Sequence, residues 1–146
     1  MFKFNLQPVL NHRQFIEDSL QKEYAHLKNR LAKQQDRLVR LEHKQQHLTD
    51  ELHYKQQQGT TSSALLLYVD FLDQLHVDIK QLVEKIMGLE NDTALKRAEL
   101  LAAMKNRKAL EKLKEKKVSE HMAILAKEEQ SFLDEIGINR HGRETP

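Results

Sequence analysis

The sequence contains no cysteine and no tryptophan among its 146 residues, and only 5% of the residues are aromatic. Without cysteine, the chain can form neither a disulfide framework nor a thiolate metal site. Only 39% of the residues are hydrophobic, whereas 32% are charged. This composition supplies too little bulky apolar surface for a rounded core, but enough for a narrow seam between long helices. It is therefore typical of coiled coils rather than of globular domains.

An excess of one charge is also missing, because 24 basic residues are balanced by 22 acidic residues, for a net charge of +2. We therefore do not expect the chain as a whole to attract nucleic acid. The longest apolar run, Ala64 to Val69, is much shorter than the roughly 20 residues of a membrane span. The first eight residues do not resemble a secretory signal. Disorder is the alternative for so polar a chain, but the regular spacing of leucine argues against it.

Helix breakers are rare, because proline occurs only at positions 8 and 146 and glycine only at 59, 88, 137 and 142. Pro8 suits the first turn of a helix, where its missing N–H costs little. Gly59 suits the left-handed position just past a helix end. The hydroxyl-bearing residues that follow it can cap a second helix. The sequence thus predicts a helix over about 8–58, a turn over about 59–63 and a helix over about 64–136.

Two leucine-rich seams have the alternating three- and four-residue spacing of coiled-coil heptads. The first comprises Leu20, Tyr24, Leu27, Leu31, Gln34, Leu38, Leu41, Gln45, Leu48 and Leu52, and the second comprises Leu65, Tyr68, Leu72, Leu75, Ile79, Leu82, Ile86 and Leu89. Gln34 and Gln45 either fix the register or are tolerated gaps. The second seam falters at Thr93 and Lys96. A shifted frame then contains Val118, Met122, Leu125, Phe132 and Ile136.

Helices joined by so short a turn run antiparallel. We therefore expect an all-α fold, a long two-helix antiparallel coiled-coil hairpin that forms a single domain over residues 1–137. Gly137 is expected to end the second helix. Residues 138–146 are then expected to form a flexible C-terminal tail.

The sequence offers little that could support catalysis. It has no glycine-rich phosphate loop and no nucleophile elbow. His43 and His47 would share one helix face, but they lie off the seam and have no evident third ligand, so two exposed histidines are the simpler interpretation. We therefore expect no enzyme activity, no catalytic residue, no metal site and no cofactor.

Two surfaces are candidates for binding other proteins. The first is a basic cluster of Lys105, Arg107, Lys108, Lys112, Lys114, Lys116 and Lys117. It is either a solvated helix face or an electrostatic guide to an acidic protein. The second surrounds Phe71, which lies beside the seam and is either a binding hot spot or a residue that flanks the core.

Three segments resemble the FliJ family of flagellar type III export proteins. They are residues 2–10 (FKFNLQPVL) followed by Arg13 and Glu17, residues 59–62 (GTTS) followed by Tyr68, Phe71 and Leu75, and residues 109–117 (ALEKLKEKK) followed by Glu120 and by LDE at 133–135. The segments occur in the order that the family has. The resemblance implies a non-enzymatic hairpin similar to the central stalk of rotary ATPases.

The resemblance also implies partners, namely the flagellar export ATPase hexamer, the cytoplasmic domain of the export gate membrane protein, and export chaperones. No nucleic acid is expected, and the hairpin is expected to be monomeric, cytoplasmic and peripherally associated with the inner membrane. The implied ATPase-ring interface comprises Arg13, Lys108, Lys112, Lys114 and Lys117, and the implied export-gate interface comprises Tyr68, Phe71, Leu75, Asp78 and Leu82. Asp78 departs from the family's mostly apolar or small gate-binding strip.

Three alternatives remain open at this stage. The chain could be a nucleic-acid-associated coiled coil that uses the basic cluster, although it lacks the interleaved aromatic residues that stack on bases. It could also be a homodimeric scaffold in which two hairpins form a four-helix bundle. The third alternative is the equivalent stalk protein of a virulence type III secretion system.

Overall fold

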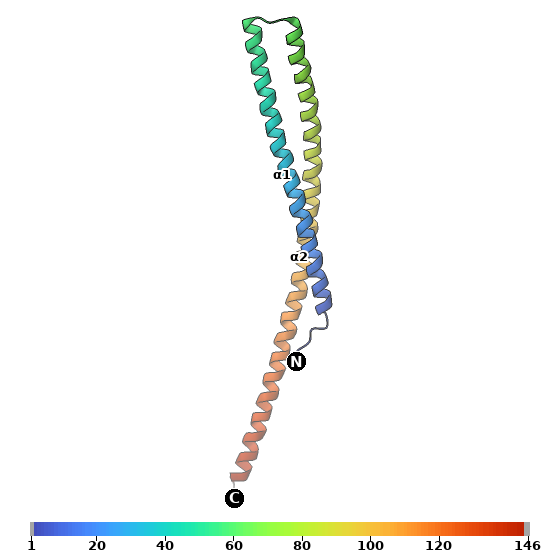
Figure 1. Ribbon diagram of the computed structural model, residues 1–146. Helices are drawn as coiled ribbons and strands as arrows, with labels where there is room; N and C mark the ends of the chain where they lie inside the picture. Colours follow the sequence, from blue (N-terminus) through green and yellow to red (C-terminus); the bar gives the residue numbers. More distant parts are fainter. Residues whose placement is uncertain (1, 145–146) are drawn as a thin grey trace. The chain divides into compact units, whose positions relative to one another are not determined.

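A computed structural model describes residues 2–144, with two helices, α1 (Gln7–Gln58) and α2 (Ser62–Glu144), and no strand among these residues (Figure 1). The all-α prediction is therefore confirmed, and the two long helices pack against each other. The chain divides into two compact units, which we call the hairpin unit (Ser19–Leu100) and the terminal unit (Met1–Asp18 with Leu101–Pro146). Nothing in the heptad pattern indicates this division.

The turn between the helices forms where the sequence predicts it. Gly59 is left-handed, with φ of 87°, a conformation that costs glycine little. The Thr61 side-chain oxygen accepts a hydrogen bond of 3.2 Å from the backbone N–H of Ala64. Thr61 is therefore the N-cap, and α2 begins at Ser62, slightly earlier than expected.

The core of the hairpin unit is the narrow seam that the heptads predict. Leu75, Leu82, Ile86 and Leu89 are buried, and every residue of the first seam is half-buried. Lys96 on α2 forms an ion pair of 2.9 Å with Glu23 on α1, far from the turn. Because an early residue of α1 contacts a late residue of the unit, the helices run antiparallel.

The second seam continues through Thr93 and Lys96 rather than faltering there. Both residues are half-buried and keep the three- and four-residue spacing. The Thr93 hydroxyl donates to the Leu89 carbonyl at 2.6 Å, and the Lys96 ammonium pairs with Glu23 and Glu99. Hydrogen bonding to Glu23, and then to Glu99, raises the pKa of Lys96. Polar side chains therefore occupy seam positions when partners satisfy them.

Gln34 is the exception among these polar seam residues. Its side-chain carbonyl oxygen is buried and has no hydrogen-bond partner among the described residues. Because an unsatisfied buried acceptor costs free energy, Gln34 weakens the seam at this point.

The terminal unit has a polar layer of its own. Leu10 and Ala103 are buried on α1 and α2. Glu17 of α1 is also buried. It forms an ion pair with Arg107 of α2, and Arg107 also pairs with Glu111 at 2.8 Å. The hydrogen bonds to Glu17 and Glu111 raise the pKa of Arg107. The inward-facing frame of both helices thus extends into this unit.

The prediction that α2 ends at Gly137 is wrong, because the helix continues to Glu144. Gly59 is the one glycine of the described residues with positive φ, so Gly137 does not make the left-handed turn that terminates a helix. Residues 138–144 of the expected tail are therefore helical. Residues 145 and 146 lie outside the described part of the chain.

Candidate interaction surfaces

The basic cluster forms a surface on the α2 part of the terminal unit. Lys105, Lys108, Lys112, Lys116 and Lys117 are exposed, and Lys114 is half-buried. We call these six lysines the basic surface. Lys117 is 3.7 Å from Glu120, whereas Lys108 and Lys112 form no ion pair with a described residue. Most of the positive charge is therefore available to a partner.

Two residues of the predicted basic sites are less accessible. Arg107 is directed inward to Glu17 and Glu111, so it stabilises the terminal unit and is not part of the basic surface. Arg13 is half-buried on α1, four residues before Glu17. The long stem of an arginine can be covered while its charged end stays in water.

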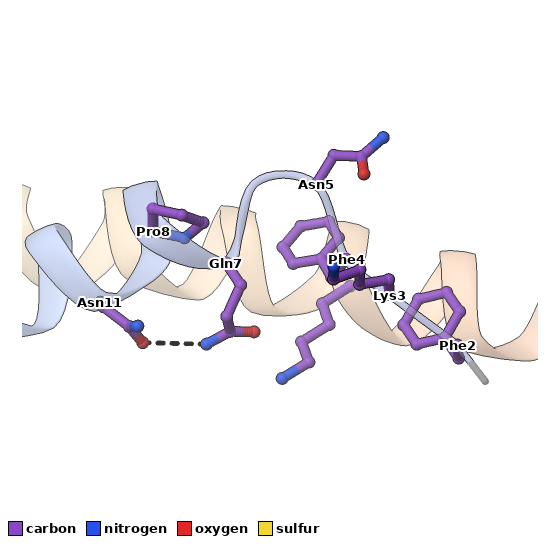
Figure 2. A pocket seen from close by; sticks show the side chains of 8 residues that line it. Phe2, Lys3, Phe4, Asn5, Gln7, Pro8 and Asn11 are labelled. Atoms are coloured by element: carbon purple, nitrogen blue, oxygen red, sulfur yellow. Dashed lines mark hydrogen bonds between the residues drawn. The ribbon is translucent and has the colours of Figure 1, made fainter.

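An open pocket lies beside the basic surface, where the segment before α1 runs along α2. It has a volume of about 730 Å³ and is lined by Phe2, Lys3, Phe4, Asn5, Gln7, Pro8, Asn11 and Lys114. Figure 2 shows Phe2 and Phe4 along the extended segment, and the hydrogen bond from Gln7 to Asn11. The Phe2 ring contacts His121, with 5.4 Å between ring centroids. The heptad pattern does not predict this pocket, although two phenylalanines two residues apart near the N-terminus are a signal for it.

A second, apolar hollow lies in the hairpin unit near the turn, and we call it the Phe71 groove. It has a volume of about 380 Å³ and is lined by Lys44, Leu48, Ala64, Leu67, Tyr68 and Phe71. Phe71 is 52% exposed and Leu67 is 71% exposed. The Lys44 ammonium lies 5.1 Å from the centre of the Phe71 ring, which is within cation–π range.

The structure separates the residues of the predicted gate interface. Leu75 and Leu82 are only 4% and 6% exposed, so they belong to the core of the hairpin unit. Asp78 is half-buried and accepts a hydrogen bond of 2.9 Å from Gln74. Of the predicted set, Tyr68 and Phe71 alone line the Phe71 groove.

Tyr68 links this groove to the seam. It is half-buried, and its hydroxyl lies near Glu51. Burial raises the pKa of Tyr68, and the Glu51 carboxylate raises it further. Tyr68 is therefore neutral at physiological pH and offers a hydroxyl at the edge of an apolar hollow.

Residues 2–144 hold no cluster of side chains that could bind a metal ion. His43 and His47 are both exposed, and no group of three or more metal-binding side chains occurs in the part of the chain that is described. Within residues 2–144, neither helix has a segment apolar enough to cross a membrane.

Comparisons with known proteins agree with this geometry. The sequence model of the family described as Flagellar FliJ protein matches residues 2–145. No curated protein sequence matches the chain. Among solved structures, a putative YscO homolog, CT670 from Chlamydia trachomatis, is similar with a TM-score of 0.59 and 18% sequence identity, over 100% of both chains. At this identity the likeness concerns the fold alone.

Proposed function

The chain belongs to the flagellar FliJ protein family, and from this premise we propose that it is a non-enzymatic, stalk-like component of the type III protein export apparatus. The observation that carries the proposal is the family match over residues 2–145. The fold supports it, because two antiparallel helices with a narrow seam offer long surfaces for partners. It works as a single hairpin in the cytoplasm, at the inner membrane.

The first proposed partner is the export ATPase hexamer, which the terminal unit binds. Lys108, Lys112 and Lys117 are exposed. At about 100° per residue, Lys108 and Lys112 lie on one side of α2 and Lys117 lies on another side. Lys114 and Arg13 are half-buried and add their charged ends. A group of positive charges around one part of a helix steers an acidic surface into contact and makes the association salt-dependent.

The second proposed partner is the cytoplasmic domain of the export gate membrane protein, which the hairpin unit binds at the Phe71 groove. Phe71 and Leu67 are the large exposed apolar side chains of this groove. An aromatic residue that a partner can desolvate is a typical hot spot. Leu75 and Leu82 act indirectly, because they are buried in the seam that holds α2 against α1. Export chaperones are the third proposed class of partner.

Binding to the purified export ATPase tests the proposed function directly. We expect the full-length chain to co-purify with the ATPase hexamer and to raise its rate of ATP hydrolysis. The binding should weaken as salt is raised, because the proposed interface is charged. A chain that neither binds the hexamer nor changes its hydrolysis rate would contradict the proposal.

A second candidate is the equivalent stalk protein of a virulence-type secretion apparatus. The chain shares its fold with a putative YscO homolog, so the fold is compatible with this variant too. Complementation distinguishes the two systems, because a flagellar protein restores motility to a strain that lacks its own copy. Restored secretion of virulence effectors without motility would support the second candidate instead.

A further inference from the structure

The C-terminal part of α2 carries an apolar stripe that the described residues of the terminal unit leave largely exposed. It comprises Val118, Met122, Leu125, Phe132 and Ile136, at heptad spacing with Glu129 between Leu125 and Phe132. Met122 and Phe132 are each 62% exposed, and Leu125 is 46% exposed. The segment before α1 reaches α2 at His121, where Phe2 contacts it. From Met122 to Gly142, every residue except the half-buried Ile136 is exposed.

An exposed apolar stripe at heptad spacing is the kind of surface that packs against a second helix. Most helices in proteins are stabilised by packing of an apolar face rather than by intrinsic propensity. A contiguous exposed apolar surface of this kind marks an interaction site. The question is which helix covers it.

Charge is divided along this part of α2 in a way that identifies the partner. Just before the stripe, Lys112, Lys114, Lys116 and Lys117 outnumber Glu115, whereas Glu128, Glu129, Asp134 and Glu135 outnumber Lys127 in its second half. A parallel, in-register pair of these helices would place each charge beside its own copy. An antiparallel pair places the acidic half of each helix beside the basic part of the other, which is favourable.

We propose that two copies of the chain pair through this stripe as an antiparallel, two-fold symmetric dimer. Met122 of each copy lies opposite Leu125 of the other, at the centre of the contact. In this register Glu135 lies beside Lys114 of the second copy, and Glu128 lies beside His121. The segment is self-complementary, as the contact surface of a two-fold dimer must be.

In the same register, a side chain of the second copy can fill the pocket that Phe2, Phe4 and Lys114 line. Phe132 of one copy lies opposite Glu115 and beside Lys114 of the other, and Lys114 lines that pocket together with Phe2 and Phe4. The phenylalanine can enter the open pocket while Glu135 pairs with the ammonium of Lys114. The apolar and the charged contacts therefore coincide at one place on each copy.

The dimer covers Lys114, which is one of the residues proposed to contact the ATPase hexamer. Pairing of two copies and binding to that partner would therefore compete, so the dimer is a resting form of the free protein. The pairing itself does not depend on the proposed function, because it follows from the stripe and the charges alone.

Light scattering on the full-length chain tests the proposal. At low salt and about 100 µM protein, a concentration suited to a micromolar dissociation constant, we expect a mass that approaches twice the monomer mass of 17.2 kDa. Phe132→Asp should shift the protein to monomer. Phe15→Asp is the control, because Phe15 is equally exposed but lies on α1, away from the stripe. A monomer mass at every concentration would overturn the proposal, as would equal effects of the two aspartates.

A charge exchange tests the antiparallel register without altering the stripe. Glu135→Lys and Lys114→Glu should each weaken the dimer, and the two together should restore it. These residues lie roughly 30 Å apart along one helix, at 1.5 Å per residue, so restoration requires that they meet across an antiparallel contact. If the double variant is as weak as the single variants while all keep full helicity by circular dichroism, the proposed register is wrong.

Discussion

Glu17 of α1 and Arg107 of α2 form an ion pair inside the terminal unit, although 90 positions separate them in the sequence. Glu17 is 7% exposed, and it is the one buried charged residue among the described residues. Arg107 also holds Glu111, so a single guanidinium joins both helices. Such a pair fixes the register of two helices, because a shift would leave a carboxylate buried without a partner.

Removing one partner of this pair should therefore destabilise the fold. We expect Glu17→Ala to lower the free energy of unfolding by about 2 kcal/mol, because the guanidinium of Arg107 loses its buried partner. The double variant Glu17→Leu/Arg107→Leu should recover most of this loss, since it removes both charges of the buried pair and leaves only the partly exposed Glu111 without Arg107. Urea unfolding followed by circular dichroism measures both effects. Equal stability of Glu17→Ala and the unmodified chain would contradict the described pairing.

Replacing Gln34 by an apolar residue should stabilise the fold, in contrast to the replacement of Glu17. The buried side-chain oxygen of Gln34 has no partner, so Gln34→Leu should raise the free energy of unfolding by about 1 kcal/mol. Gln35→Leu is the control, because Gln35 is exposed and its replacement should change stability little. If both variants are equally stable, the burial of Gln34 has no energetic consequence.

Glycine-to-alanine replacements should have opposite signs at two positions. Gly59 has φ of 87°, so Gly59→Ala should destabilise the hairpin by about 1 kcal/mol. Gly137 lies inside α2, so Gly137→Ala should stabilise the helix by roughly 0.5–1 kcal/mol. An added methyl group meets no atom at either position, so backbone conformation alone accounts for the difference. Helicity at 222 nm during thermal unfolding measures both, and a loss of helicity in Gly137→Ala would contradict the continuous helix.

The ion pair of Lys96 should make the hairpin unit sensitive to alkaline pH. Its partner Glu23 raises the pKa of Lys96 above the ordinary value of 10.5. The stabilisation is therefore fully present below that pH and is lost as the pH rises through the raised pKa. We expect Lys96→Met to melt at a lower temperature than the unmodified chain near neutral pH, with the difference shrinking at alkaline pH. Lys22→Met is the control, because Lys22 is exposed, and it should show no pH-dependent difference.

The seams and the turn could be predicted from the sequence because they depend on local signals. Leucine at heptad spacing, Pro8 near a helix start and Gly59 after a helix end each have a direct physical meaning. The buried position of Arg107 could not be read in the same way, because a run of lysines surrounds it and its partner Glu17 is distant in sequence. A strict count of three and four along α2 would have placed both Lys96 and Arg107 on the inward face.

The candidate surfaces were only partly predictable. Leu75 and Leu82 were expected at an interface, yet their heptad positions direct them into the seam, where they are buried. Phe71 lies one position beside the seam and remains exposed. The continuation of α2 beyond Gly137 was missed because a glycine ends a helix only when the backbone takes a left-handed turn there.

The central claim is that two surfaces on this chain serve two different partners, and paired variants test it. Phe71→Ala alters the hairpin unit, and Lys112→Gln/Lys114→Gln/Lys117→Gln removes three of the six positive charges of the basic surface on the terminal unit. Leu95→Ala is the apolar control, since Leu95 is exposed in the hairpin unit. Lys22→Gln/Lys33→Gln/Lys80→Gln is the charge control, since these lysines are exposed elsewhere.

The most direct measurement is the affinity of each variant for the purified ATPase hexamer and for the purified cytoplasmic domain of the export gate. We predict that Phe71→Ala weakens binding to the gate domain at least about tenfold, as expected for a hot spot, and leaves binding to the hexamer unchanged. The triple lysine variant should do the reverse, and both controls should bind normally. Equal loss of both partnerships in the two variants, with helicity and melting temperature preserved, would contradict the account.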